Sequence, residues 1–138
     1  MTDSTTQPRI LIVEDEFLIS MTAEDELRDA GFDVVGVAST YEEAVRLAEE
    51  QRPDLVLMDI RLGSKRDGID AAIEIRARFD LPSLLTTGNH DADSARRAGP
   101  ADPVGWLHKP YSLPGLVEAV RHALKDQSAT GPATVSQT

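Results

Sequence analysis

Short apolar runs alternate with longer amphipathic stretches from residue 9 to residue 126. The short runs predict five β-strands, because a few consecutive apolar residues bounded by turn residues fit a buried strand. These strands cover residues 9–13, 34–38, 54–60, 83–87 and 104–108. Apolar residues at helical spacing predict helices over 17–30, 41–51, 68–79 and 113–125, and a short helix near 92–98.

Capping residues support two of these helices. Gly31 follows the first helix, where glycine is favoured because it adopts the left-handed conformation easily. Ser39 or Thr40 is the expected N-cap of the second helix, with Glu43 as a candidate capping-box partner. Alternating strands and helices imply parallel strands joined by right-handed crossovers. We therefore expect an α/β fold in which helices cover both faces of a five-stranded parallel sheet, in the flavodoxin-like order 2-1-3-4-5.

The composition narrows the class of protein. The 138 residues suit one domain, which we place at residues 9–126, with disordered ends at 1–8 and 127–138 because these ends hold little that could pack. Because 24 acidic residues outnumber 14 basic ones, binding to nucleic acid or to an anionic membrane is not expected. The absence of cysteine excludes disulfides and thiolate metal sites. Without a signal segment or a long apolar run, a cytoplasmic location is expected.

Polar residues stand at the ends of four predicted strands. They are Glu14 and Asp15 after the first strand, Asp59 in the third, Thr86 and Thr87 in the fourth, and Lys109 after the fifth. Ligands of open parallel sheets bind beyond the carboxyl ends of the strands, so we expect these residues to converge on one crevice. Thr86 and Thr87 point to opposite faces of their strand, and the spacing from Pro82 favours Thr87 for the crevice.

The crevice needs positive charge, because three neighbouring carboxylates repel one another. Lys109 supplies one charge, and a divalent cation supplies the rest; Mg²⁺ is the usual choice where phosphate is handled. Asp59 would then be a carboxylate nucleophile that forms an aspartyl phosphate, with Lys109 and the Thr87 hydroxyl on the phosphoryl oxygens. Taken singly, Asp59 also fits a turn carboxylate, Lys109 a solvated lysine, and the acidic run 14–16 a favoured helix start.

Five segments of the sequence match a known family. They are ILIVEDE, DLVLMDIRL, the Asp67-Gly68 pair, LPSLLTTG and WLHKPYS. Each is weakly specific alone, but the ordered set resembles the CheY-like receiver domains of two-component response regulators, in the stand-alone form without an output domain. The resemblance implies that a histidine kinase or a histidine phosphotransfer protein supplies a phosphoryl group, and that the domain then changes its protein partners.

The resemblance assigns the acceptor and the metal ligands. It implies that Asp59 accepts the phosphoryl group and that Asp15 binds Mg²⁺ directly. Glu14 would assist through water, and the backbone carbonyl of Arg61 would complete the protein ligands. No outside substrate would be turned over, so the chain is not expected to be an enzyme.

The resemblance also assigns the residues that would change position when Asp59 carries a phosphoryl group. Thr87 becomes the switch hydroxyl, Lys109 the residue that pairs with phosphate, and Lys109–Pro110 a cis peptide bond. Trp106 takes the place of the switch aromatic, usually Tyr or Phe; packing in the core or at an interface is the alternative role. Residues 89–103 are expected to be short, mobile and central to the switch, because Pro and Gly are crowded there.

The loop after Asp59 departs from the usual family pattern. Gly63 stands where Pro is usual, in a loop one residue longer, and this form is similar to receivers of alphaproteobacterial stress and light signalling. Gly88-Asn89 resembles the Thr-Gly variant of their FAT GUY group, whose aromatic residues are missing here. Arg61 and Asn89 flank the crevice and are expected to control the access of water to the phosphoryl group.

Two other functions stay open. The Trp106 substitution is compatible with an inert interaction module of receiver fold. A hydrolase with an aspartyl-phosphate intermediate is disfavoured, because such enzymes often carry a second Asp where Arg61 stands.

Partner surfaces are also indicated. Phe17, Leu18 and Met21 lie off the inner stripe of the first helix, where kinases of the family dock. The chain is expected to be a monomer or a weak homodimer, with the fourth helix, the fifth strand and the fifth helix as candidate dimer surface. His90 lies near the crevice, but without a second histidine at metal-ligand spacing it is not expected to bind metal.

Overall fold

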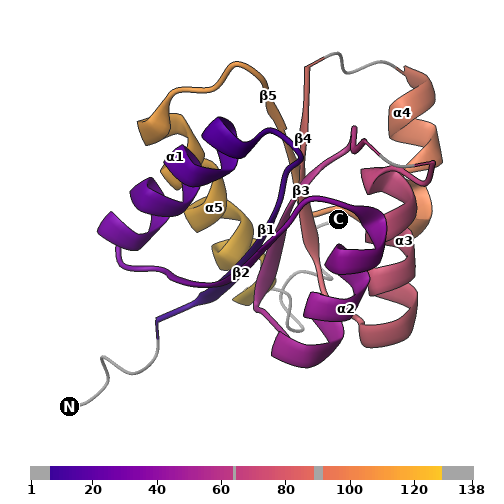
Figure 1. Cartoon of the computed structure of the whole chain (residues 1–138), viewed down its shortest axis with the longest axis horizontal. Helices are drawn as coiled ribbons and strands as arrows, with labels where there is room; N and C mark the ends of the chain where they lie inside the picture. Colours follow the sequence, from indigo (N-terminus) through magenta and orange to yellow (C-terminus); the bar gives the residue numbers. More distant parts are fainter. Residues whose placement is uncertain (1–6, 64, 89–91, 129–138) are drawn as a thin grey trace.

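The computed structural model describes residues 7–63, 65–88 and 92–128. Its strands form one parallel sheet in the order β2-β1-β3-β4-β5 (Figure 1). The strand bounds are β1 Arg9–Val13, β2 Asp33–Ala38, β3 Leu55–Asp59, β4 Ser83–Thr87 and β5 Gly105–His108. The predicted α/β fold and strand order are confirmed.

Helices cover both faces of this sheet (Figure 1). On one face lie α1 (Phe17–Asp29) and α5 (Leu113–Ser128), and on the other lie α2 (Tyr41–Gln51) and α3 (Gly68–Phe79). A short helix, α4 (Ala92–Arg97), and a 3₁₀ helix, η2 (Gly99–Ala101), precede β5. Within the described part of the chain, no helix has the length and apolar character that a membrane crossing needs.

The sheet divides the core into two halves. Leu11 and Val13 of β1 pack with α2 and α3, whereas Ile10 and Ile12 pack with α1 and α5. Side chains alternate in direction along a strand, which explains the division. All of β3 is buried, as expected of a central strand covered on both faces. Each large apolar side chain buried in this way stabilises the fold by about 1.5–3 kcal/mol, so the strand ends are firmly placed.

Local hydrogen bonds fix the start of α2 and the end of α1. Thr40 is the N-cap of α2, and its Oγ1 accepts from the Glu43 backbone N–H at 3.1 Å. The Glu43 carboxylate accepts from the Ser39 N–H at 2.9 Å. Thr40 is therefore the cap, and Ser39 receives the reciprocal contact of Glu43. Gly31, directly after the α1 C-cap, has a φ of 98°, which confirms the conformation expected of it.

Some element ends differ from the prediction. α5 continues to Ser128, beyond the predicted end at Lys125, because residues 126–128 contain no Gly or Pro that would stop it. Residues 127 and 128 of the predicted tail belong to this helix. Residues 129–138, like residues 1–6, lie outside the described part, so the disordered ends stay a prediction. The helix predicted near 92–98 ends at Arg97 and continues as η2, because Pro100 lacks the N–H that would extend an α-helix.

Candidate functional site

Three charged side chains meet at the carboxyl edge of the sheet. Lys109 Nζ lies 3.1 Å from Glu14 Oε1 and 3.2 Å from Asp59 Oδ2. Glu14 follows β1, Asp59 ends β3 and Lys109 follows β5, so the contacts join distant parts of the chain. Glu14 is 5% exposed and Asp59 is 4% exposed. The structure thus brings together three of the residues singled out at the predicted strand ends.

Backbone hydrogen bonds hold these residues at the edge. The Glu14 N–H donates to the Ala38 carbonyl at 2.9 Å, which extends the pairing of β1 with β2. The Lys109 N–H donates in the same way to the Thr87 carbonyl at 2.8 Å. Because the buried strands fix the backbone at each position, the charged groups reach the edge with little freedom to separate.

Lys109 offsets only part of the negative charge at this edge. Burial, followed by the charge of Asp59, raises the pKa of Glu14 to about 7, although hydrogen bonding and charge from Lys109 oppose the rise. Burial lowers the pKa of Lys109, but the charges and hydrogen bonds of Asp59 and Glu14 outweigh burial and raise it overall. Lys109 is therefore a protonated ammonium between two carboxylates. Buried charges are costly unless they are compensated, so the edge favours an additional cation.

A third carboxylate makes the cluster suitable for a metal ion. Oxygen atoms of Glu14, Asp15 and Asp59 all lie within 4.8 Å of one another. Asp15 is exposed whereas the other two are buried, so the group opens to solvent on the Asp15 side. Carboxylate oxygens are the hard ligands that Mg²⁺ and Ca²⁺ prefer. The donor set therefore fits the divalent cation that the sequence predicts.

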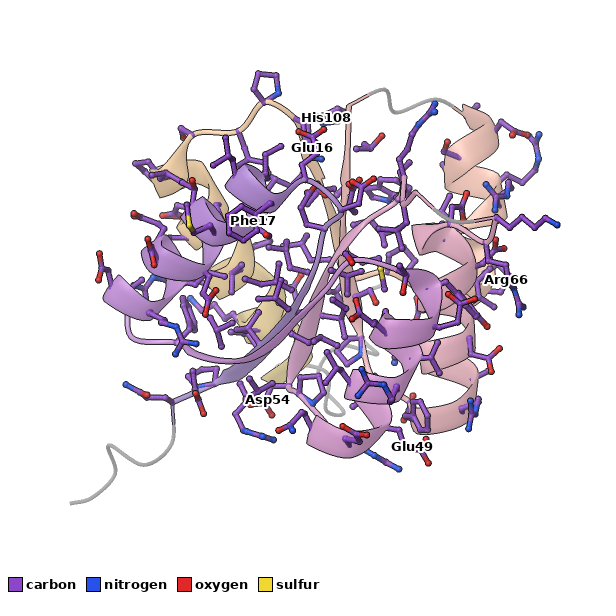
Figure 2. All side chains as sticks on the ribbon, in the orientation of Figure 1. Glu16, Phe17, Glu49, Asp54, Arg66 and His108 are labelled. Atoms are coloured by element: carbon purple, nitrogen blue, oxygen red, sulfur yellow. The ribbon has the colours of Figure 1, made fainter. Side chains whose placement is uncertain are left out.

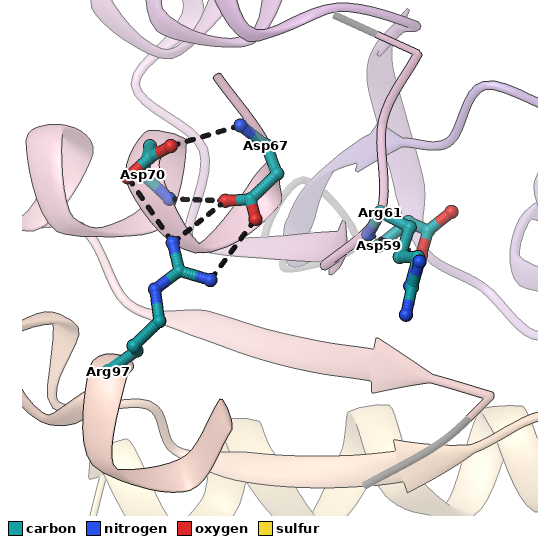
Figure 3. A network of polar contacts seen from close by, with 5 residues as sticks. All are labelled: Asp59, Arg61, Asp67, Asp70 and Arg97. Atoms are coloured by element: carbon teal, nitrogen blue, oxygen red, sulfur yellow. Dashed lines mark hydrogen bonds and ion pairs between the residues drawn. The ribbon is translucent and has the colours of Figure 1, made fainter. Parts of the chain in front are cut away.

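An open cleft of about 320 Å³ gives access to the cluster. Its lining residues are Asp15, Glu16, Asp59, Arg61, Gly88 and Lys109. The backbone N–H of Arg61 donates to Asp59 Oδ1 at 3.1 Å, so each carboxylate oxygen of Asp59 has its own donor. Figure 3 shows Arg61 next to Asp59 just beyond β3. The contact that Arg61 makes here is through its N–H; a metal-binding role of its carbonyl stays a prediction.

The two threonines of β4 are both buried, Thr86 at 2% and Thr87 at 1% exposure. Thr86 lines a small hollow towards α1 together with Tyr111. Because neighbouring strand residues point to opposite faces, Thr87 lies on the face that carries α3. Trp106 is half-buried and packs against the core half of α2 and α3. Thr87 and Trp106 therefore share one face of the sheet, and the switch role of each stays a prediction.

Two contacts of the segment around the Asp67-Gly68 pair were not predicted from the sequence. A Cβ atom on Gly68 would lie 1.8 Å from the Asp59 carbonyl oxygen, so only glycine fits there without a shift. Arg97 of α4 forms ion pairs with Asp67 and Asp70 at the start of α3. The spacing of the two aspartates is that of a capping box and could have been read from the sequence. Nothing in the sequence indicates Arg97 as their partner.

Other predicted positions are also placed. The Lys109–Pro110 bond is cis, as predicted. On the exposed side of α5, His122 Nε2 lies 3.7 Å from Asp126 Oδ2. His90 and Asn89 lie outside the described residues.

Residues 10–121 match the family described as the response regulator receiver domain. The chain belongs to this family. The transcriptional regulatory protein PdtaR of Mycobacterium tuberculosis is 41% identical to the receiver over 122 residues, covering 88% of this chain and 59% of that protein. The phyllosphere-induced regulator PhyR of Methylorubrum extorquens is 43% identical over 116 residues, covering 83% of this chain and 43% of that protein. The receiver thus spans about half the length of these relatives.

A solved structure supports the same family. The signal receiver domain of a modulated diguanylate cyclase from Desulfovibrio desulfuricans superposes with a TM-score of 0.80 at 36% identity, covering 88% of this chain and 97% of that one. The receiver is therefore a response-regulator module of two-component signalling. Receiver domains of this class interact with a kinase or a phosphotransfer protein. Receivers typically bind Mg²⁺ at an acidic cluster, and Glu14, Asp15 and Asp59 form such a cluster here.

Proposed function

We propose that Asp59 of this receiver accepts a phosphoryl group from a histidine of a kinase or phosphotransfer protein, and that the transfer requires Mg²⁺. The position of Lys109 supports this most strongly, because its ammonium lies between Glu14 and Asp59, 3.1 and 3.2 Å from their oxygens. A phosphoryl group on Asp59 would find this positive charge already in place. Charges positioned before the reaction stabilise its transition state without a cost of reorganisation.

The chemistry is a direct transfer. One carboxylate oxygen of Asp59 forms a bond to phosphorus while the bond from phosphorus to the donor histidine breaks, and the released imidazole takes up a proton from solvent. Asp15, Asp59 and the Arg61 carbonyl would hold Mg²⁺, with Glu14 acting through water. When bound, Mg²⁺ would supply positive charge to the phosphoryl oxygens. Lys109 and the Arg61 N–H hold the Asp59 carboxylate in place for the attack.

The switch would act through the segment between β4 and β5. A phosphoryl oxygen on Asp59 would attract the Thr87 hydroxyl, and Trp106 lies on the same face of the sheet as Thr87. None of the six residues of α4 is buried, so α4 can move at low cost. A local change of charge would in this way alter the surface of α4 and β5, where a downstream protein would bind.

The phosphodonor would dock on an apolar groove beside Lys109. Phe17, whose side chain lies at the start of α1 (Figure 2), is 73% exposed, Leu18 is 70% exposed and Met21 41%. A groove of about 440 Å³ lies next to them and is lined by Leu18, Ile19, Thr22, Ala23, Lys109, Pro110, Tyr111 and Leu113. Lys109 lines the groove and also belongs to the acceptor cluster, formed by Glu14, Asp59 and Lys109. A helix bound in the groove would therefore bring its histidine near Asp59.

Beryllofluoride, which takes the place of a phosphoryl group on aspartate, tests the acceptor role. We would add it with Mg²⁺ to the wild type, to Asp59→Asn and to the control Asp25→Asn, an exposed position on α1. Backbone amide spectra of the wild type and the control should shift from residue 59 through β4 and β5, whereas Asp59→Asn should not respond. A wild type that does not respond would instead be an inert interaction module.

A further inference from the structure

The helix α4 packs weakly against the rest of the receiver. None of its six residues is buried, and a helix of this length is not stable by itself. Directly after it, Ala98 and Ala101 are buried in the core half of α2 and α3, but alanine side chains bury little apolar area. Polar contacts therefore contribute a large share of what holds α4 in place.

The segment formed by α4 and η2 is firmly attached to α3 at its C-terminal end, around Ala101 and Asp102. Arg76 Nε donates to the Ala101 carbonyl at 3.1 Å, and its terminal nitrogen donates to the Asp102 carbonyl at 3.0 Å. The Arg76 side chain is only 21% exposed. Two backbone acceptors and a largely buried guanidinium make this end a fixed point.

The α4 part of this segment is held to α3 by a weaker contact, made by Arg97. Arg97 lies 3.2 Å from Asp67 and 3.4 Å from Asp70, so one guanidinium bridges two carboxylates (Figure 3). All three side chains are between 31% and 43% exposed. Exposed ion pairs contribute little stability, so this bridge can open without unfolding the domain.

The two carboxylates belong to the start of α3, which contacts the backbone of the proposed acceptor Asp59. Asp67 and Asp70 form a reciprocal capping box, each accepting from the backbone N–H of the other at 3.1 Å. The next residue, Gly68, donates its N–H to the Ile60 carbonyl at 3.0 Å. A Cβ on Gly68 would meet the Asp59 carbonyl oxygen at 1.8 Å. A shift of the peptide at Asp59 would therefore push on Gly68 and on the capping box next to it.

We propose that Arg97 is a positioning residue whose bridge to Asp67 and Asp70 locks α4 to the start of α3 and thereby couples α4 to the occupancy of Asp59. The coupling rests on the acceptor role proposed above, but its route runs along α3 rather than through Thr87. The bridge belongs to the state with an unmodified Asp59. Filling Asp59 opens the bridge, and by thermodynamic reciprocity opening the bridge favours filling of Asp59.

The test compares Arg97→Ala with Arg96→Ala. Arg96 lies on the same helix and carries the same charge, but it pairs within α4 with Asp93 at 2.8 Å. We would measure amide hydrogen exchange over residues 92–97 without ligand, and the affinity for beryllofluoride with Mg²⁺ by fluorine NMR. Arg97→Ala should exchange faster in α4 and bind beryllofluoride about two- to fivefold more tightly, the range of an exposed ion pair. Arg96→Ala should match the wild type in affinity.

Each other outcome counts against the coupling. If amide exchange in α4 and beryllofluoride affinity are the same in Arg97→Ala and Arg96→Ala, the bridge does not lock α4. If α4 of Arg97→Ala exchanges faster but its beryllofluoride affinity is unchanged, the bridge is only a structural contact. Asp70→Asn keeps an oxygen for the capping box but removes a charge that Arg97 contacts, so Arg97→Ala must have a smaller effect in that background. A wild type that binds no beryllofluoride would overturn the acceptor role and the coupling together, whereas equal binding by all variants would overturn the coupling alone.

Discussion

Gly68 lies so close to Asp59 that a Cβ atom on Gly68 would sit 1.8 Å from the Asp59 carbonyl oxygen. The opposing atom is backbone at the end of the central strand, so it cannot rotate away as a flexible side chain would. Gly68 is needed for this close approach and not for a left-handed φ, since among the described glycines only Gly31 has one. The start of α3 is thus in direct contact with the peptide that carries the candidate acceptor.

Gly68→Ala should therefore disturb both the fold and the site. Forcing the extra methyl group against backbone should lower the free energy of unfolding by about 1–3 kcal/mol, the usual cost of overpacking. It should also weaken beryllofluoride binding, because the Asp59 peptide must move. Urea unfolding and fluorine NMR would measure the two effects. Gly99→Ala is the control, since a Cβ there meets nothing within 4 Å; equal stability of the two variants would refute the contact.

The Arg97 bridge predicts a pH effect at Asp67. Partial burial raises the pKa of Asp67, but hydrogen bonds from Arg97 and from the backbone of Asp70 outweigh it and lower the pKa below the ordinary 3.8. Asp67 therefore stabilises the fold above pH 3.8, and this contribution is lost as the pH falls through the lowered value. Arg97→Ala should move the pKa back up, and Arg96→Ala should not. NMR titration of the carboxyl carbons measures the pKa of Asp67 in each variant. An Asp67 pKa that is the same in Arg97→Ala as in the wild type would contradict the bridge.

Ser83 offers a gain in stability. Its hydroxyl is buried in β4 and has no hydrogen-bond partner among the residues described. Ser83→Ala removes the unpaired group and should raise the free energy of unfolding by about 1 kcal/mol in urea. Ser112→Ala is the matched control, because Ser112 Oγ accepts from the Gly115 N–H at 3.0 Å at the start of α5 and its loss should cost about 1 kcal/mol. Equal destabilisation by both changes would be evidence against an unpaired Ser83.

Arg61 should influence how long a phosphoryl group stays on Asp59. Its side chain is exposed and lines the cleft in front of Asp59, so we expect it to limit the approach of water. Arg61→Ala should shorten the lifetime of the phosphorylated receiver several-fold, as followed by loss of the phosphorylated mass with time. Lys65→Ala, in the same loop, is the control and should leave the lifetime unchanged. If both lifetimes equal that of the wild type, Arg61 does not control access.

The strands and the acceptor cluster could be predicted because both depend on burial. Apolar runs in a parallel sheet covered on both faces are nearly continuous, so the bounds of β1 and β4 agree with the sequence pattern residue by residue. Once the strands are parallel, their carboxyl ends share one edge, and Glu14, Asp59 and Lys109 have to meet there.

Contacts that depend on the path of a loop could not be predicted. Arg97 reaches Asp67 across 30 residues of sequence, and this needs α4 to lie in one place. No apolar stripe of α4 fixes that place, since none of its residues is buried. The closeness of Gly68 to Asp59 likewise depends on how residues 61–67 return to the sheet. Periodicity carries information about buried faces and very little about such turns.

Chemical mapping of the phosphorylated residue tests the role of Asp59 most directly. The receiver would be incubated with acetyl phosphate and Mg²⁺ and then reduced with borohydride, which converts an aspartyl phosphate to homoserine that peptide mass spectrometry can locate. Homoserine should replace Asp59 alone, and a chelator or the Lys109→Ala change should strongly reduce it. Homoserine at a different aspartate, or an unchanged Asp59 in a receiver that has taken up phosphate, would show that Asp59 is not the acceptor.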